Sequence, residues 1–132
     1  METASPSEVG AVAEREVAYA LGRSGFDVYL PVFGAHSRID LPAVRQGRVT
    51  RVQVKSGRLV GEAVVFHTCS NTANVSRDYL GEVDAFGVHA PELGTSYLVP
   101  IADAPMRACY LRTAPPKNNQ VKGIRWAEDY SL

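Results

Sequence analysis

Thr50-Arg51-Val52-Gln53-Val54-Lys55 is the most informative segment of the sequence, because it predicts a β-strand with two different faces. Successive side chains of a strand point to opposite sides, so Arg51, Gln53 and Lys55 share one face and the two valines share the other. The valine face suits an apolar core. On the polar face, the cationic side chain of Lys55 lies two residues from the amide side chain of Gln53.

A hairpin is predicted to join this strand to the one before it. Residues 38–44 and 49–55 have strand-like composition, and the turn between them, Arg45-Gln46-Gly47-Arg48, contains a glycine that can supply positive φ. In the register that this turn sets, Asp40 faces Gln53, which puts their Cβ atoms about 4.5–5.5 Å apart.

The facing oxygens of Asp40 and Gln53 suit a hard divalent cation such as Mg²⁺, which fills its other positions with water and phosphate oxygen. Lys55 on the same face could orient an attacking water or neutralise charge developing on a phosphate. A second interpretation stays open, in which Asp40 is a solvent-facing residue hydrogen-bonded to Gln53 and Lys55 is a surface charge. Pro42 also indicates an edge strand or a bulge, and a bulge would shift the register.

The start of the chain predicts an amphipathic helix. Ser5-Pro6-Ser7-Glu8 has the pattern of a capping box, and the apolar residues that follow recur close to every 3.6 positions until Gly22 or Ser24. Glu14 lies at the edge of the apolar stripe, where its carboxylate could reach the sheet, whereas Glu16 lies on a different face. An ordinary solvent-facing position is the alternative for Glu14.

The rest of the chain predicts more strands and a short C-terminal helix. Strands are expected near residues 26–30, 63–68, 83–89, 95–100 and 108–112, and a helix near 124–130. Residues 69–82 predict a loop with a short helix. This order of elements predicts one domain over residues 1–132, of the α/β (α+β) class, with a mixed β-sheet flanked by helices.

Charge is unevenly distributed, although the formal net charge is zero. Residues 41–60 contain five basic and no acidic side chains, and residues 105–132 contain five basic side chains against two acidic ones. Such patches can meet a phosphate backbone, because local potential matters more than total charge. An uneven but ordinary solvated surface is the alternative.

Composition excludes several classes of protein. The hydrophobic fraction of 45% and the charged fraction of 21% are those of a globular domain and not of a disordered chain. No apolar run reaches the roughly 20 residues of a membrane helix. The N-terminus lacks the basic and apolar regions of a secretory signal, so a cytoplasmic protein with no membrane partner is expected. Cys69 and Cys109 have no metal-binding spacing and are expected to be reduced thiols.

The order of the polar residues resembles that of the PD-(D/E)xK nuclease superfamily. In that motif an Asp and a second acidic residue bind metal, and a Lys two residues later serves the nucleophile. Asp40 matches the Asp, Lys55 matches the Lys, and Gln53 occupies the acidic position. Residues 10–16 are similar to the opening of archaeal Holliday-junction resolvases, whose helix Glu would correspond to Glu14.

The chain as a whole resembles the small PD-(D/E)xK homing endonucleases of group I introns, which tolerate Gln at the acidic position. The resemblance spans about residues 8–130. It is carried outside the core motif by Val83-Asp84-Ala85-Phe86, Val99-Pro100, Leu111-Arg112 and Ala127-Glu128-Asp129-Tyr130.

The resemblance implies a restriction-endonuclease-like core and Mg²⁺- or Mn²⁺-dependent hydrolysis of DNA. Asp40, Gln53 and the backbone carbonyl of Val54 would hold the ion, Glu14 would complete the site through water, and Lys55 would orient the attacking water. The basic residues expected to bind DNA are Arg45, Arg48, Arg51, Arg58, Lys117 and Lys122.

Homing-type and junction-resolving activities both fit this resemblance. A homo-oligomer, dimer or tetramer, is expected, because one small domain cannot cut two DNA strands with one site at once. The alternative is a catalytically inactive nuclease-fold module that binds DNA or regulates a partner. The uncharged Gln53 keeps this alternative open, since it lowers the negative potential available to hold a divalent ion.

Overall fold

The fold is built on a five-stranded mixed sheet, seen in a computed structural model that describes residues 3–34, 37–72, 75–115, 118 and 122–132. The strand order is β1-β2-β3-β8-β9. The five strands are β1 (Asp27–Val28), β2 (Leu41–Arg45), β3 (Arg48–Ser56), β8 (Ala85–Ala90) and β9 (Thr95–Pro100). Neighbouring strands are antiparallel except for the central pair, β3 and β8, which is parallel.

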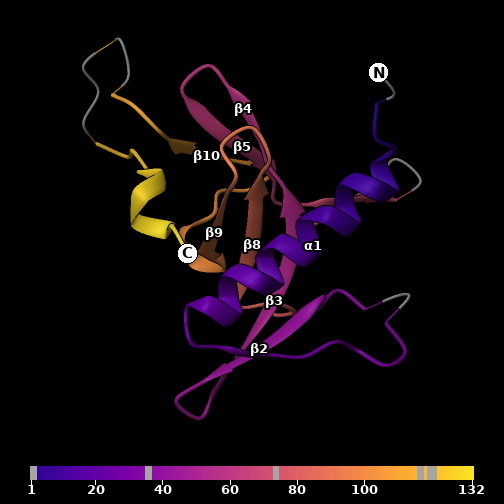
Figure 1. The fold of residues 1–132 in the computed structure, drawn as a ribbon. Helices are drawn as coiled ribbons and strands as arrows, with labels where there is room; N and C mark the ends of the chain where they lie inside the picture. The colour runs from indigo at the N-terminus through magenta and orange to yellow at the C-terminus, as the bar shows by residue number, and fades with distance from the viewer. Residues whose placement is uncertain (1–2, 35–36, 73–74, 116–117, 119–121) are drawn as a thin grey trace.

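The helix α1 (Pro6–Arg23) runs across one face of this sheet (Figure 1). It begins with the predicted capping box, in which the Ser5 side chain accepts from the Glu8 backbone and the Glu8 side chain accepts from the Ser5 backbone. Val17 and Leu21 of α1 pack on apolar residues of β2 and β3. Gly87 of β8 makes this close approach possible, since a Cβ there would lie 2.5 Å from Val17 Cγ1.

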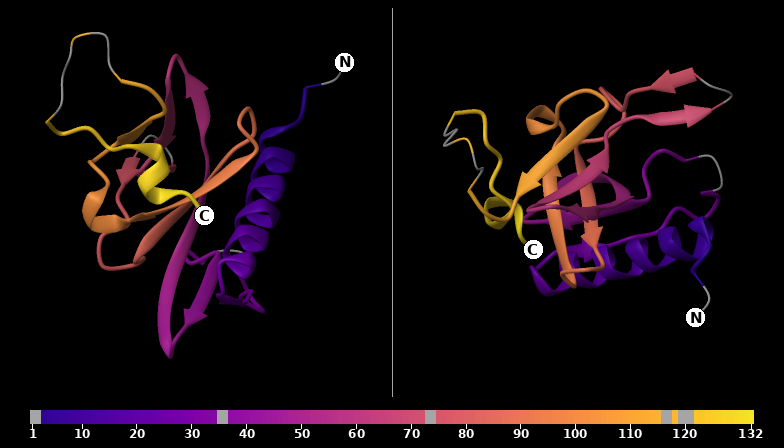
Figure 2. Two further views of the ribbon diagram at one scale, coloured as in Figure 1. Left: turned by 60° about the vertical axis from the view of Figure 1, so that its left-hand side comes forward. Right: turned by 90° about the horizontal axis from the view of Figure 1, so that it is seen from above.

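A second, smaller sheet covers the other face of the main sheet (Figure 2). It consists of β4 (Arg58–Val60), β5 (Ala63–His67) and β10 (Ala108–Arg112), in the order β10-β5-β4. Val64 and Phe66 of β5 share a core with Phe86 of β8 and Leu111 of β10. The mixed α+β class is therefore confirmed, and in the described residues the layers on the main sheet are one α-helix and this second sheet.

The β2–β3 hairpin has the predicted register. Arg45 pairs with Arg48 and Leu41 with Val52, so no bulge interrupts the strand at Pro42. Gln46 and Gly47 both have positive φ, 53° and 74°, as expected for the tight turn that matches the strand twist. Continuing this register by one residue brings Asp40 beside Gln53.

Two elements differ from the sequence prediction. The short helix expected within residues 69–82 is absent from the described residues. A two-stranded hairpin, β6 (Ser70–Thr72) and β7 (Val75–Arg77), begins that segment instead. The chain ends in a 3₁₀ turn, η2 (Ala127–Tyr130), which is shorter than the helix expected over 124–130. A further 3₁₀ turn, η1 (Ile101–Asp103), follows β9.

Among the described residues, no helix combines the length and the apolar character that crossing a membrane requires.

Both cysteines are free thiols; Cys109 is buried, and Cys69 is half-buried. Burial raises the pKa of the Cys109 thiol to about 11, which keeps it protonated and unreactive near neutral pH.

Candidate active site

Asp40 lies immediately before β2 and is fixed against β3 by two hydrogen bonds. Its backbone N–H donates to the Val52 carbonyl at 2.9 Å, and the Val54 backbone N–H donates to its Oδ2, also at 2.9 Å. The hairpin therefore holds the Asp40 carboxylate over the middle of β3, where Gln53 lies.

Two opposing influences act on the charge of Asp40. Burial raises the pKa of the Asp40 carboxyl, and the charge of Glu14 raises it further, whereas the Val54 hydrogen bond and the charge of Lys55 lower it. The net pKa is above the ordinary value of an aspartate. A divalent cation would reverse this balance, because an adjacent positive charge favours the ionised carboxylate.

Gln53 supplies a buried oxygen that has no partner among the described residues. Its Nε2 donates to the Val54 carbonyl at 3.4 Å, whereas its Oε1 is buried and accepts no hydrogen bond from the described residues. A buried polar atom without a partner typically costs about 1–3 kcal/mol, so such an atom in a native fold calls for an explanation. A cation coordinated by Oε1 is the explanation that its neighbour Asp40 favours.

Lys55 follows on the same face of β3. Its Nζ donates to the Tyr79 hydroxyl at 3.0 Å and lies 4.6 Å from the centroid of the Tyr79 ring. In the described part of the chain Lys55 makes no ion pair, although its charge contributes to the lowering of the Asp40 pKa. The ammonium group is therefore near the carboxylate but is anchored by a tyrosine.

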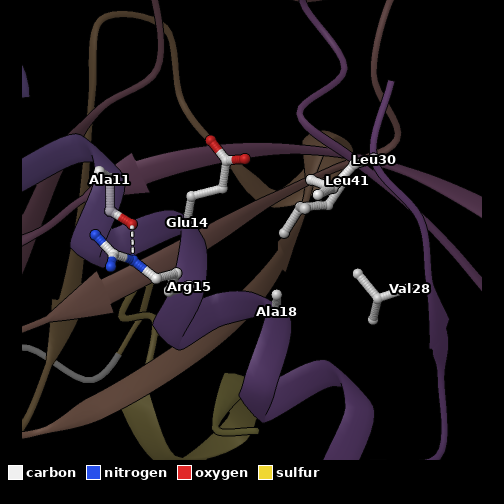
Figure 3. Close-up of a pocket in the computed structure, with 7 residues that line it drawn as sticks. All are labelled: Ala11, Glu14, Arg15, Ala18, Val28, Leu30 and Leu41. Carbon is white, nitrogen blue, oxygen red and sulfur yellow. Dashed lines mark hydrogen bonds between the residues drawn. The ribbon is translucent and has the colours of Figure 1, made fainter. Parts of the chain in front are cut away.

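Glu14 comes to this region from α1 (Figure 3). Its carboxylate extends away from the guanidinium of Arg15, which turns back to the Ala11 carbonyl at 3.3 Å. The cavity beside it has a volume of about 440 Å³. Leu41, the residue after Asp40, lies in its wall, and the full lining is Ala11, Glu14, Arg15, Ala18, Val28, Leu30 and Leu41. Glu14 thus lies on the Asp40 side of the helix, which is consistent with its effect on the Asp40 pKa.

These groups form a donor set of oxygen atoms that fits a hard cation. No group of three or more His, Cys, Asp or Glu side chains is placed to hold a metal within the described residues. Two carboxylates and one amide oxygen, from Asp40, Glu14 and Gln53, lie in the region with the backbone of Val54 beside them. All-oxygen ligands suit Mg²⁺ and Mn²⁺, and Mg²⁺ commonly keeps several waters.

The basic residues near the β2–β3 turn have different surroundings. Arg45 donates to the Ser24 carbonyl at 3.2 Å and lies over the Phe26 ring, 4.3 Å from its centroid. Arg48 is exposed and lines an open cavity of about 800 Å³ together with Arg45 and Asp84.

The other basic residues are spread over the chain. The Arg51 side chain pairs with Asp84 through two hydrogen bonds and donates to the Gly81 carbonyl as well. Arg58 is exposed on β4, and Lys122 is exposed near the C-terminus. Lys117 lies outside the described residues.

Comparison with known proteins gives the family. The sequence matches the model of a family described as PD-(D/E)XK endonuclease over residues 4–132. The chain belongs to the PD-(D/E)XK endonuclease family. No curated protein matches the sequence. Among solved structures, the bacterial homing endonuclease I-Ssp6803I is similar in fold, with a TM-score of 0.76 and 20% identity over 97% of this chain and 89% of the other.

The Gln53 side chain presents a neutral oxygen that accepts no hydrogen bond from the described residues. Two further residues belong to the region but were not placed by sequence reasoning. Tyr79 contacts Lys55, and Arg38 lies over the Tyr79 ring. Spacing in the sequence does not place either residue, because their contacts join segments that are distant in sequence.

Proposed function

We propose that this PD-(D/E)XK endonuclease is a divalent-metal-dependent DNA endonuclease, with the whole of residues 1–132 acting as one nuclease domain. The observation that carries the proposal is the buried Oε1 of Gln53, which has no partner among the described residues and lies beside Asp40 and upstream of Lys55 on one strand face. If Gln53 were an ordinary surface residue, water would hydrogen-bond its side-chain oxygen, and no buried acceptor would be left without a partner.

The residues that would hold Mg²⁺ or Mn²⁺ are Asp40, the Oε1 of Gln53 and the backbone carbonyl of Val54, with Glu14 acting through water. Such an ion, when bound, supplies positive charge to a phosphoryl oxygen and lowers the pKa of nearby water. Asp40 and Glu14 are the only negative charges in this set, so the site holds the ion less strongly than one with a third carboxylate.

Lys55 is the residue of this chain that orients the attacking water and stabilises the charge on the phosphate. Its ammonium group donates a hydrogen bond that orients the attacking water and stabilises the negative charge that develops on the phosphate. The water oxygen forms a bond to phosphorus while the bond from phosphorus to the 3′ oxygen breaks in line with it. The attacking water releases a proton to the surrounding solvent, and the departing 3′ oxygen takes up a proton from solvent. The products are a 5′ phosphate and a 3′ hydroxyl.

Arg45, Arg48 and Arg58 are the candidates for contacts with neighbouring phosphates, with Lys117 and Lys122 extending that surface. Such contacts fix the position of DNA without reading its sequence. Arg51 shares the charged region, but its guanidinium is already engaged by Asp84.

Cleavage of both strands needs two copies of this site, so we propose a homo-oligomer, a dimer or a tetramer, that acts on DNA in the cytoplasm. A homing-type enzyme would orient two sites on one duplex. A junction-resolving enzyme would orient them on the strands of a four-way junction. The preferred DNA substrate distinguishes these two types.

The test is cleavage of labelled duplex and four-way-junction DNA with Mg²⁺ and with EDTA, by the wild type and by Lys55→Ala. Arg23→Ala is the matched control, because it removes a positive charge from the last turn of α1. We expect metal-dependent cutting by the wild type and by the control, and no cutting by Lys55→Ala. Cutting that survives Lys55→Ala would show that the site lies elsewhere.

A second candidate function is DNA binding without catalysis. The neutral Gln53 favours it, as does the lack of a cluster of three metal-ligating side chains in the described residues. This module would bind DNA equally well in Mg²⁺ and in EDTA, would cut no substrate, and would be unaffected by Lys55→Ala.

A further inference from the structure

Lys55 depends on one neighbour for its position. In the described part of the chain its Nζ has one hydrogen-bond partner, the Tyr79 hydroxyl at 3.0 Å, and no carboxylate within ion-pair distance. A lysine side chain has a flexible four-carbon stem, and it loses about 2 kcal/mol of rotamer entropy when it is held in one conformation. A contact that holds it in one position therefore matters for any reaction in which it takes part.

Tyr79 is itself rigidly held. Its side chain is 4% exposed, and its ring packs edge-on against Phe86, with centroids 5.6 Å apart and planes at 90°. Phe86 faces Gln53 in the parallel pairing of β3 and β8. The tyrosine ring thus packs against β8, which pairs directly with β3, the strand that carries Gln53 and Lys55.

Arg38 also contacts the tyrosine ring. Its guanidinium carbon lies 3.7 Å from the Tyr79 ring centroid, a cation–π contact. The same guanidinium pairs with Glu82 at 3.1 Å and donates to the Ser70 hydroxyl at 3.2 Å. Arg38 is therefore tied to β6 and to the segment before β8, and through it those segments hold the tyrosine in place.

We propose that Tyr79, held by contacts with Arg38 and Phe86, is a positioning residue that sets the Lys55 ammonium beside Asp40 and Gln53. The inference rests on the proposed function, because Lys55 is the group that the tyrosine positions. The Tyr79 hydroxyl accepts a hydrogen bond from the Lys55 ammonium, and the ring also has the Arg38 guanidinium over it. Both cations therefore contact the same phenol.

The electrostatics of the tyrosine give a signature of this arrangement. Burial alone raises the pKa of Tyr79, but hydrogen bonds and charges from Lys55 and Arg38 lower it by more, so the net pKa is below the usual value. Burial raises the pKa of Tyr97 and Tyr130 instead. Tyr79 should therefore be the first of these three tyrosines to ionise as pH rises.

The first test is Tyr79→Phe, which removes the hydroxyl and keeps the ring against Phe86 and Arg38. We expect the single-turnover cleavage rate to fall by about 10- to 100-fold, the usual effect of misplacing a reacting group by about 1 Å. DNA affinity and the Mg²⁺ concentration for half-maximal rate should be unchanged, because Asp40 and Gln53 are untouched. Tyr110→Phe, at an exposed position on β10, is the control and should cut like the wild type.

The second test needs no cleavage. The ultraviolet band of tyrosinate is titrated in EDTA for the wild type, Tyr79→Phe and Lys55→Met. We expect one early-ionising tyrosine in the wild type, its loss in Tyr79→Phe, and its shift to higher pH in Lys55→Met. This titration also carries the test if Tyr79→Phe does not fold.

Each outcome separates the two proposals. Wild-type cutting that is lost in Lys55→Ala but unchanged in Tyr79→Phe would overturn the positioning role and leave the proposed function standing. An early-ionising tyrosine that is unaffected by Lys55→Met would overturn it as well. A wild-type chain that cuts no DNA in Mg²⁺ would overturn the proposed function and this inference with it.

Discussion

The guanidinium of Arg51 binds both oxygens of the Asp84 carboxylate. Nη2 lies 3.0 Å from Oδ1, Nε lies 3.1 Å from Oδ2, and the Arg51 backbone N–H donates to the same Oδ2 at 2.8 Å. Asp84 directly precedes β8, so the pair joins the two central parallel strands at one end. The side-chain hydrogen bond from Arg51 is the main reason that the pKa of Asp84 is lowered.

This pairing separates the roles of Arg51 and Arg48. Each phosphate contact contributes about 0.9 to the slope of log affinity against log salt on duplex DNA. We expect Arg48→Ala to lower that slope by about 1, because Arg48 is exposed at the hairpin turn. Arg51→Ala should leave the slope unchanged and lower the melting temperature instead. DNA-binding isotherms over a range of salt concentrations and thermal melts measure both effects. An equal loss of slope in the two variants would mean that Arg51 leaves Asp84 to bind phosphate.

Asp40 should make the metal-free protein less stable as pH rises. Its pKa is raised in the folded state, so the folded protein binds the proton more tightly than the unfolded chain does. The stability from this proton is fully present below the ordinary carboxyl pKa and is lost as pH rises through the folded pKa. In EDTA near neutral pH, we expect Asp40→Asn to raise the free energy of unfolding, because the neutral amide avoids the cost of burying a charged carboxylate. Urea unfolding of both proteins across the acid range measures the difference.

Asp84 is the matched control for that experiment, because its pKa is shifted the opposite way. Its lowered pKa contributes stability that is present above the ordinary carboxyl pKa and is lost as pH falls through the folded pKa. Asp84→Asn should therefore destabilise the protein at neutral pH and bring no such loss on acidification. If Asp40→Asn and Asp84→Asn change stability in the same direction at neutral pH, the charge environment assigned to Asp40 is incorrect.

Gln53→Glu should strengthen metal binding. The substitution places a carboxylate where the structure, as far as it describes the chain, shows a buried oxygen without a hydrogen-bond partner. The shape of the carboxylate differs little from that of the amide. We expect a lower Mg²⁺ concentration for half-maximal cleavage, and a lower melting temperature in EDTA because Asp40 is close by. Calorimetric titration with Mg²⁺ and thermal melts with and without EDTA measure these effects. Unchanged Mg²⁺ affinity in Gln53→Glu would remove Gln53 from the ligand set.

Gly87→Ala should destabilise the fold through the contact of α1 with the sheet. The new methyl group would lie 2.5 Å from Val17 Cγ1 and 3.0 Å from Val52 Cγ1, both of which are fully buried. Overpacking of this kind costs about 1–3 kcal/mol. We expect Val17→Ala, added to Gly87→Ala, to recover part of that loss. Unfolding by urea gives both values.

Gly10→Ala is the control for a glycine without neighbours. Gly10 lies within α1, and nothing approaches within 4 Å of a Cβ built there. Alanine should therefore stabilise the helix by roughly 0.5–1 kcal/mol, the usual difference between the two residues. A loss of stability in Gly10→Ala would point to packing on this face of the helix.

The hairpin that carries Asp40 and Gln53 could be predicted from the sequence, because local rules determine it. A glycine in a tight turn sets the register, and the alternation of residues 51–55 sets the face. The capping box likewise located the start of α1. The pairing of Leu41 with Val52 confirms that register.

Contacts between distant segments could not be predicted in the same way. Residues 69–82 have no apolar alternation. The β6–β7 hairpin is connected to Arg38, whose guanidinium donates hydrogen bonds to the Ser70 hydroxyl and to the Arg77 carbonyl. From the sequence, Arg51 is expected to bind phosphate because it is basic and lies in a basic segment. Its ion-pair partner, Asp84, is 33 residues away in the sequence and could not be inferred from the neighbouring residues. Tyr79 and Lys55 are 24 residues apart and meet only in the folded chain.

The parallel pairing of β3 with β8 also bears on when the protein becomes a nuclease. Residues 57–84, which contain β4, β5 and the β6–β7 hairpin, separate the two strands in the chain. Such long-range pairing is slow to form because loop-closure entropy opposes it. The antiparallel β2–β3 hairpin is local and can form early. In a chain still leaving the ribosome, the oxygens of Asp40 and Gln53 that we propose as metal ligands can therefore be in place while the ammonium of Lys55 still lacks the Tyr79 hydroxyl. We expect cutting competence to be acquired late, when folding is nearly complete, so that truncated chains do not damage the DNA around them.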